Sequence, residues 1–431
     1  MKRNLIVLVS ILCFTMHIFG QDNIKVMYYN ILDYPLVPTA SQAPYLKTIF
    51  DYYHPDVLVC DEVSSDAIAI DILNNVINIT TGNTYAKAAF VDGPDKDNML
   101  FYNLAKLKLK SQDTIQTAQR LINRYRLYHN TTTADTVFLD FYAAHLKASS
   151  GADNELKRYQ ECVHFKNYIA TETQGHNIIL GGDFNLYTSA EAAYQLLLSP
   201  ANYPMFDPIN TPGVWDNSLT FAPIHTQSSR TTAFGGGATG GMDSRFDFIL
   251  VTNDLLNTAN NAYYISGTYK ALGNDGLHLN KALIETPIST TVPAEVTNAL
   301  YLMSDHLPVV MELSVNVNTA LPEPTNYPAT FSATNIRLQW NDAIGPNLPS
   351  GYLARMSSVS FDAILPPTDG IPVADSPTDK NAAYGKQEAW FTNLTPNTTY
   401  YFKIYGYTGT GSNINYKTDG TIPQVLKITT P

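Results

Sequence analysis

The chain has 431 residues, 45% of them hydrophobic, and a formal net charge of −11. This length and composition allow a large core and a second domain. The acidic charge argues against broad electrostatic capture of nucleic acid or anionic membranes. It does not exclude either as a substrate, because an acidic shell can surround a metal-loaded site. Only 3 cysteines are present, which excludes a dense disulfide scaffold. We expect Cys60 and Cys162 to be buried thiols, with a single disulfide as the alternative.

The first 20 residues have the pattern of a secretory signal peptide. Lys2 and Arg3 precede an apolar run from Leu5 to Phe19, and the small residue Gly20 follows it. Roughly 15 apolar residues are too few for a membrane-spanning helix, which needs ~20. Cleavage after Gly20 removes two cations and changes the formal charge from −11 to −13. We therefore expect a secreted or periplasmic protein that is monomeric and has no stable membrane anchor.

From Asn23 to about residue 316, short apolar runs alternate with helix-like stretches, which is typical of an α/β domain with buried strands. A helix is predicted near Pro44 to Tyr53. Polar residues gather where the apolar runs begin or end, so the predicted strands share one polar rim. The runs that predict strands are IKVMYYNIL, PDVLVCDEV, NMLFYN, TVFLDFYAAHL, HNIILGGDFN, SRFDFILVT and DHLPVVMELSV.

The tail differs in texture. Residues 317–326 are rich in proline and predict a linker, and residues 327–431 contain strand-like runs without helical periodicity. Trp340 lies in an early run, Tyr352 begins another, and Tyr400 lies in the run LTPNTTYYFKIYGY. This pattern resembles a fibronectin type III domain, an all-β sandwich of the immunoglobulin-like type. Such domains bind partners or space other domains, so we expect the tail to bind a protein or a glycan.

Two further segments have unusual compositions. The glycine-rich run at residues 235–241 lacks the Lys and Ser/Thr of a phosphate-binding loop, so we expect a flexible surface loop. Residues 262–272 are rich in tyrosine and predict a hairpin. An ordinary hairpin is the preferred interpretation, and contact with lipid or with bases is the alternative.

Acids, amides and histidines follow the apolar runs. Burying a carboxylate at a strand end costs several kcal/mol unless it is paired or bound to metal, so repeated placement of such groups indicates a site. Oxygen ligands without a cysteine cluster favour Mg²⁺, Mn²⁺ or Ca²⁺ over zinc. Singly, each residue has an ordinary explanation, such as Asn30 capping a turn or His145 being a satisfied core histidine. The residues at these positions are Asn30, Glu62, Asp183, Asn185, Asp305 and His306.

In their order along the chain, these motifs resemble those of the endonuclease/exonuclease/phosphatase family, which includes deoxyribonucleases, bacterial sphingomyelinases and inositol phosphatases. The resemblance covers about residues 24–316. It implies a two-sheet α/β sandwich whose active site lies at one rim. The matching motifs are YYNIL for the opening Asn strand, DEV for the metal-binding Glu, AAHLKA for the first histidine, GGDFN for GDxN, SRFDFIL for the Arg-x-Asp-Tyr strand and SDHLPV for the closing motif.

The resemblance also implies metal ligands. Glu62, with help from Asn30 and Asp305, would hold the metal, which neutralises developing negative charge on the phosphate. Asp183 would accept a proton from the attacking water or orient it, and Asn185 would donate a hydrogen bond to a phosphate oxygen.

Two histidines complete the implied set. His306 would contact the phosphoryl oxygens, and Asp247 would fix its tautomer and raise its basicity. His145 would be a general acid for the leaving oxygen, or a phosphate ligand if a second metal takes that part.

Some residues depart from the family pattern or lie outside it. Asp61 stands where the family commonly has Gln, and Phe248 replaces the usual Tyr. Asp97 and Asn98 are candidate partners for His145. Asn98 and Arg120 are also candidate substrate contacts. Arg124 and Arg126 are further candidates, with a solvated surface as the alternative.

The leading functional hypothesis is a secreted, metal-dependent nuclease that cleaves DNA or RNA. The alternative within the same chemistry is a phospholipase C-type sphingomyelinase or a phosphoinositide phosphatase. A non-catalytic binding protein on the same fold is the alternative from another class, but it predicts lost ligands, and every main motif is present.

Overall fold

The structure is a computed structural model that describes most of the chain. Residues 1–19 of the expected signal peptide and residues 318–320 of the expected linker lie outside the described residues. The chain divides into two compact units, one comprising Gln21–Thr131 with Thr136–Val317 and the other containing Asn318–Pro431. The described ranges are 20–35, 42–129, 137–171, 177–201, 203–258, 260–317, 321–344, 348–411, 414–418 and 422–431.

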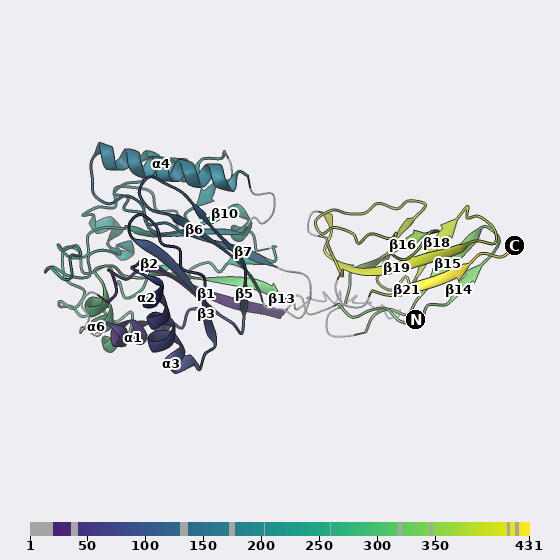
Figure 1. Cartoon of the computed structure of the whole chain (residues 1–431), viewed down its shortest axis with the longest axis horizontal. Coiled ribbons are helices and arrows are strands. Elements are labelled where there is room, and N and C mark those ends of the chain that lie inside the picture. The colour runs from purple at the N-terminus through teal and green to yellow at the C-terminus, as the bar shows by residue number, and fades with distance from the viewer. Residues whose placement is uncertain are drawn as a thin grey trace, which may run out of the picture. The chain divides into compact units, whose positions relative to one another are not determined.

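The N-terminal unit contains two β-sheets (Figure 1). In the first sheet β1 and β2 are parallel, and the other registered pairs are antiparallel. β12 pairs with β13 beside the main path. The strands of this sheet, in spatial order, are β11 (Ala262–Tyr264), β13 (Val309–Val317), β1 (Gly20–Asn30), β2 (Val57–Val63), β4 (Asp97–Asn103) and β3 (Tyr85–Lys87), with β12 (Lys270–Ala271) alongside.

In the second sheet β7 and β8 are parallel and the other pairs are antiparallel. Its inner face contributes side chains such as Phe141, Ile179 and Ile249 to the same buried cluster as the first sheet, so the two sheets share one core. In spatial order its strands are β5 (Leu107–Ile115), β6 (Ile122–His129), β7 (Phe138–Ala143), β8 (Ile178–Asp183), β10 (Asp247–Thr252) and β9 (Met205–Phe206).

Helices cover the outer faces of the sandwich, with α4 on one side and α1, α2, α3 and α6 on the other (Figure 1). The helix predicted near Pro44 is α1, which has proline in its first turn and buries Leu46, Ile49 and Phe50. Within the described residues, no helix combines the length and apolar character needed to cross a bilayer. The helices are α1 (Ala43–Tyr53), α2 (Asp66–Asp71), the π-helix η1 (Ile72–Ile77), α3 (Asn78–Thr81), α4 (Ala152–Ile169), α5 (Ala192–Leu198) and α6 (Ala294–Met303), with 3₁₀ turns η2 (Leu219–Ile224) and η3 (Asn253–Leu256).

The C-terminal unit is formed from two antiparallel sheets. Its main core contains Trp340, whose ring packs edge-on against Tyr352 at a centroid distance of 5.5 Å. The strand-like runs near Trp340, Tyr352 and Tyr400 are present as β15, which ends just before Trp340, β16 and β19. One sheet contains β14 (Ala329–Phe331), β15 (Asn335–Gln339) and β18 (Glu388–Thr392), and the other contains β17 (Asp379–Ala383), β16 (Gly351–Ser357), β19 (Thr399–Thr408), β20 (Asn415–Tyr416) and β21 (Gln424–Ile428).

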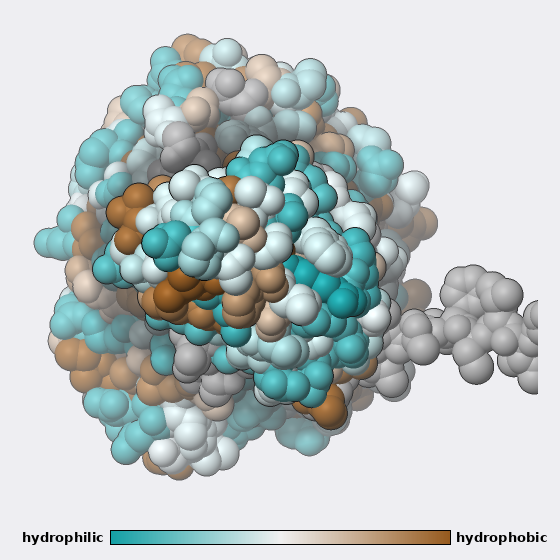
Figure 2. Space-filling view, turned by 90° about the vertical axis from the view of Figure 1, so that its right-hand side faces the viewer, coloured by the Kyte–Doolittle hydropathy of each residue, from teal (hydrophilic) through white to brown (hydrophobic). Residues whose placement is uncertain are grey.

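Hydrophobic and hydrophilic residues are interspersed on the face shown in Figure 2, with a compact hydrophobic patch among them. Several large apolar side chains of the C-terminal unit are exposed, including Phe331, Trp390 and Ile428. Exposed apolar side chains of this kind are available to a partner, although isolated ones are ordinary on protein surfaces.

The prediction of a tyrosine-rich hairpin at residues 262–272 is wrong. β11 and β12 do not pair with each other, because both pair with β13. Tyr264 and Tyr269 are buried, and the Tyr269 hydroxyl accepts a hydrogen bond from the Arg245 guanidinium. These two tyrosines are therefore core residues and are not available to lipid or bases. Cys60 and Cys162 are buried free thiols, as expected.

Each unit has its own hydrophobic clusters, and no cluster of described residues contains members of both. We therefore predict that a chain ending near Asn318 folds and keeps most of the phosphodiesterase activity that the sequence resemblance implies, measured on a small soluble phosphodiester. Thermal unfolding and turnover of the shortened and full-length proteins check this. An insoluble or inactive shortened protein would show that the tail completes the fold.

Candidate active site

The polar strand ends meet at one edge of the sandwich. Because β1 and β2 are parallel, Asn30 and Glu62 lie at neighbouring strand ends. β10 runs antiparallel to β8, so its first residue, Asp247, lies directly opposite Asp183, the last residue of β8. The Ser304 hydroxyl donates to the Asn30 carbonyl oxygen at 2.8 Å and attaches the segment before β13 to the same edge.

Local backbone geometry explains the residues of the GGDFN motif. Gly182 has φ 131°, and a Cβ at this position would lie 2.4 Å from the Ala144 carbonyl oxygen. Only glycine fits this close approach. Asn185 follows with φ 52°, a left-handed conformation that asparagine tolerates better than most residues.

Glu62 also has an unusual backbone conformation, with φ 65°. The pairing of β2 with β4 shifts register between Asp61 and Val63, which leaves Glu62 without a partner in the ladder. A bulge of this kind changes the direction of a side chain. A left-handed conformation in a non-glycine residue indicates a position maintained against strain, as is common at functional sites.

Glu62, Asn30 and Asp183 form a hydrogen-bonded row. The Asn30 amide nitrogen donates to Glu62 Oε1 at 3.1 Å and to Asp183 Oδ2 at 3.2 Å. Asp183 Oδ1 accepts from the Asn185 backbone N–H at 3.1 Å, and the Asn185 amide donates to the Leu146 carbonyl oxygen at 3.2 Å. One amide therefore joins the two carboxylates that the sequence placed on different strands.

Both histidines face Asp183. Its Oδ2 lies 3.4 Å from His145 Nε2 and 3.6 Å from His306 Nε2. His306 Nδ1 lies 2.8 Å from Asp247 Oδ2, which is the carboxylate–imidazole pair implied by the family resemblance. His145 Nδ1 is buried without a hydrogen-bond partner among the described residues, and Asp97 instead accepts from the Gly93 backbone N–H.

Asp305 lies beside this row and is held by a loop. Its Oδ2 accepts from the Ala238 backbone N–H at 2.6 Å and from the Gln227 amide at 3.2 Å. A Cβ on Gly237 would lie 2.8 Å from Asp305 Cγ. The glycine-rich run at residues 235–241 is mostly exposed, as expected of a surface loop, but Gly237 and Ala238 approach this site carboxylate closely.

Asn98 and Arg120, expected as substrate contacts, have other partners. Asn98 is buried, and its amide nitrogen donates to the carbonyl oxygens of Leu121 and Ala143 and to the Asn123 side chain. This amide joins β4 of the first sheet to β6 and β7 of the second sheet. Its role toward substrate stays a prediction.

The Arg120 guanidinium donates to Asp95 and to the Leu146 carbonyl oxygen at 3.0 Å each. It thereby supports the segment that carries His145, and substrate contact stays a prediction for it too. Arg124 and Arg126 both pair with Asp140 in the second sheet.

Burial and charge give the two histidines opposite character. Burial lowers the pKa of His145 well below its usual value, and the nearby Arg120 adds to this effect. Burial also opposes protonation of His306, but Asp247, Asp305 and Asp183 outweigh it and raise the His306 pKa well above its usual value. The surroundings therefore favour the neutral form of His145 and the protonated form of His306.

Asp183 and Glu62 have raised pKa values. Burial raises the pKa of Asp183 to about 7 against the influence of His306, and repulsion from Asp247 and Glu62 adds to the rise. Burial likewise raises the pKa of Glu62. Carboxylates with these shifts gain stabilisation from a nearby cation.

A metal ion fits the chemistry of this group. Asp183, Asp247 and His306 each offer a donor atom, these atoms lie within 4.8 Å of one another, and all three residues are buried. This group could hold a metal ion. Glu62 and Asn30 add oxygen atoms next to Asp183, and oxygen-rich sets of this kind suit hard divalent cations.

Comparisons with known proteins give a match only in structure. No family model and no curated protein matches the chain. It is similar to the human Nocturnin catalytic domain, with 18% identity, coverage of 69% of this chain and 97% of that chain, and a TM-score of 0.43. It is also similar to D. rerio TDP2, solved with a single-strand DNA product, with 14% identity, coverage of 68% of this chain and 98% of that chain, and a TM-score of 0.45. For an endonuclease/exonuclease/phosphatase family protein from Bacteroides thetaiotaomicron the identity is 12%, the coverage is 70% of this chain and 98% of that chain, and the TM-score is 0.42.

Sequence reasoning missed two groups at the site. Lys96 lies 3.7 Å from Glu62 Oε2 and pairs with Asp33, so its ammonium neutralises this end of the row. The Gln227 amide contacts both Asp305 and His306. Neither residue lies in a recognisable motif, and the only available signal was the polar character of the segments that carry them.

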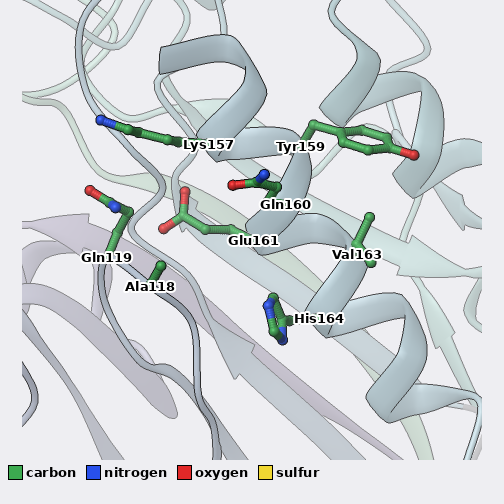
Figure 3. A pocket seen from close by; sticks show the side chains of 8 residues that line it. All are labelled: Ala118, Gln119, Lys157, Tyr159, Gln160, Glu161, Val163 and His164. Carbon is green, nitrogen blue, oxygen red and sulfur yellow. The ribbon is translucent and has the colours of Figure 1, made fainter. Parts of the chain in front are cut away.

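A pocket of about 500 Å³ lies along α4, apart from these residues. Gln119, Gln160 and Glu161 contribute polar side chains to it, while the Tyr159 ring points to the other side of the helix (Figure 3). The Glu161 carboxylate accepts from the Lys147 backbone N–H at 2.9 Å. Glu161 therefore connects α4 to the segment that follows His145.

Asp61, which the sequence left without a role, is buried behind Asp183. Its Oδ2 accepts from the Asp183 backbone N–H at 2.9 Å, and its Oδ1 has no hydrogen-bond partner among the described residues. Burial, with repulsion from Asp183, raises the Asp61 pKa well above its usual value. The folded protein therefore binds a proton here that the unfolded chain releases above about pH 4.

We predict that Asp61→Asn stabilises the metal-free protein more at pH 8 than at pH 5. The raised folded-state pKa means that wild-type stability falls as pH rises above the unfolded-state pKa, and asparagine removes this fall. Wild type should therefore lose stability relative to Asp61→Asn between pH 5 and pH 8, because asparagine has no proton to release. Urea unfolding with chelator at both pH values measures it, and Asp92→Asn on the surface is the control. Equal effects at the two pH values would contradict the assignment.

Proposed function

We propose that the N-terminal unit is a divalent-metal-dependent phosphodiesterase, with nucleic acid as its preferred substrate. The observation that carries this proposal is the continuous network in which the Asn30 amide joins Glu62 to Asp183, next to the His306–Asp247 pair. Hard oxygen donors, a proton acceptor and a cationic imidazole at one strand edge are the parts that phosphoryl transfer needs. The ordered motifs in the sequence support the same reaction class.

The residues divide the chemistry as follows. Glu62, with help from Asn30 and Asp305, would hold the divalent ion, which would neutralise charge on the phosphoryl group. Water attacks phosphorus and gives its proton to Asp183, while the phosphorus–oxygen bond to the leaving group breaks and the leaving oxygen takes a proton from solvent water.

The two histidines have separate parts in this proposal. His306, kept cationic by its carboxylate neighbours, binds a phosphoryl oxygen. His145 is neutral in this proposal, and its Nε2 lies 3.4 Å from Asp183 Oδ2 in the free protein. Its low pKa argues against the general-acid role that the family resemblance offered.

The lipid-directed alternative loses its main candidate for membrane contact. The tyrosines at positions 264 and 269 are buried in the core, so they cannot enter a bilayer. Nucleic acid therefore remains the preferred substrate class. The site itself has the same chemistry in both alternatives.

An assay panel tests the substrate class. Plasmid DNA, RNA, sphingomyelin liposomes and a small phosphodiester are incubated with the protein and Mg²⁺, Mn²⁺ or Ca²⁺ in turn, with chelator as the blank. We expect cleavage of DNA or RNA that requires an added ion. Efficient hydrolysis of sphingomyelin, without cleavage of either nucleic acid under any of the three ions, would overturn the assignment.

We predict that Glu62→Gln weakens metal binding and lowers turnover without lowering thermal stability. Glutamine keeps the acceptor for Asn30 but removes the charge, so the shape of the site changes little. Calorimetric titration with Mn²⁺ and turnover at saturating ion measure the two effects. Glu155→Gln, an exposed change on α4, is the control. A variant that binds Mn²⁺ as tightly as wild type would place the metal elsewhere.

We further propose that the mature protein is exported and begins near Gln21, and that the C-terminal unit is a fibronectin type III-like partner-binding domain. The first part rests on the signal-like N-terminal sequence. The second is supported by buried Trp340 and by the Tyr400 hydroxyl, which accepts from the Thr395 backbone N–H at 2.9 Å, as in the tyrosine corner of such domains. Mass spectrometry of the secreted N-terminus and binding to protein or glycan arrays test these two parts.

A further inference from the structure

Gln227 lies between two residues of the SDH motif. Its amide nitrogen is 2.6 Å from His306 Nε2 and 3.2 Å from Asp305 Oδ2. Its side chain is half-buried. Among the described residues, no other side chain forms a hydrogen bond with His306 Nε2, and Asp183 Oδ2 lies 3.6 Å away. Asp247 contacts the opposite ring nitrogen, Nδ1.

The backbone on both sides of this amide is fixed. Gln227 N–H donates to the Ser244 carbonyl oxygen at 3.0 Å, and the Gln227 carbonyl oxygen accepts from the Asp243 and Ser244 N–H groups at 2.9 Å each. Gln227 also forms an isolated β-bridge with His306. Its side chain therefore starts from a backbone position tied to the residue that it contacts.

The preceding residue connects the same segment to β10. The Thr226 hydroxyl accepts from the Phe246 and Asp247 backbone N–H groups at 3.1 Å each, and the Thr226 carbonyl oxygen accepts from the Leu307 N–H at 2.7 Å. This short stretch thus holds the residues before and after His306 and the carboxylate that pairs with it. A displacement of Gln227 would be felt by both partners of the imidazole.

The chemistry of an amide suits this position. The nitrogen of a primary amide carries two N–H donors, so Gln227 can contact Asp305 Oδ2 and an unprotonated Nε2 of His306 at the same time. Asp247 secures the ring at Nδ1 and Gln227 secures it at Nε2. Two contacts on opposite sides fix the rotation of the ring, whereas a single contact leaves it free to turn about that bond.

We infer that Gln227 is a positioning residue of the active site, whose amide holds the His306 imidazole and the Asp305 carboxylate in register for the phosphoryl group. This inference rests on the proposed phosphodiesterase function and adds a residue to it. A phosphoryl oxygen that enters the site then meets a ring already turned toward it, while the hydrogen bond to Asp305 keeps the amide in place. Gln227 then acts through His306 and does not touch the reacting atoms.

The central test compares Gln227→Met with wild type. Methionine has nearly the same length and removes both hydrogen bonds, so kcat should fall about 10- to 100-fold, the range seen when outer hydrogen-bond partners of site residues are lost. KM should change by less than about threefold, because the substrate-binding groups remain. Gln160→Met, an exposed change on α4, should leave both constants unchanged. An unchanged kcat in folded Gln227→Met would overturn the inference.

A second variant guards against loss of the fold. Gln227→Glu keeps the shape and places a carboxylate beside Asp305, so it should lower kcat at least as much as methionine while the melting temperature stays within a few degrees of wild type. Full activity of this glutamate variant would also contradict the positioning role, since the amide donors would then be dispensable.

A spectroscopic measurement separates this inference from the proposed function. In histidine-labelled protein, the His306 ring resonances, assigned by their absence from His306→Ala, should shift in Gln227→Met and stay in place in Gln160→Met. If wild type cleaves no phosphodiester, the proposed function fails, and this shift alone decides whether Gln227 orients His306. Unchanged ring resonances would overturn the positioning role even in an active enzyme.

Discussion

The constraint on which the rest of the site depends is the burial of several carboxylates where two sheets end. Asp61, Asp183 and Asp247 are each no more than 3% exposed. Unpaired buried charges of this kind are costly, so the surrounding groups must donate hydrogen bonds or carry positive charge. The Asn30 amide and the His306 ring meet this need within the protein. A cation would meet the rest, and Asp183, Asp247 and His306 could hold one.

Much of this arrangement could be predicted from the sequence because strand ends are local features. Buried strands appear as apolar runs, and the residues at their ends face a common edge in any parallel pair. The sequence alone therefore predicts that Asn30, Glu62 and Asp183 lie at one rim. Asp247 opposite Asp183 needed the family pattern as well, because nothing local shows that β10 runs antiparallel to β8.

What the sequence could not show are contacts made by irregular segments. Gln227 and the 235–241 run follow no periodicity, and their importance arises from close approach to Asp305. The prediction of a hairpin at residues 262–272 was wrong for a related reason. Two short strands with a turn between them look like a hairpin, but each finds its hydrogen-bond partner in distant β13. Pairing with a third strand is a tertiary choice that local composition does not encode.

The distribution of charge around the site bears on how a polyanion is selected. The chain has a formal net charge of −11, yet Lys96 and His306 place positive groups at opposite ends of the carboxylate row. Charges on the surface act over about a Debye length, ~8 Å at physiological salt, so distant acidic residues repel a substrate only weakly once it is at the site. Attraction is thus short-ranged and local. Selectivity for the proposed substrate must then come from the segments that border the row, among them the glycine-rich loop, whose Ala238 N–H donates to Asp305, and the segment that carries Lys96.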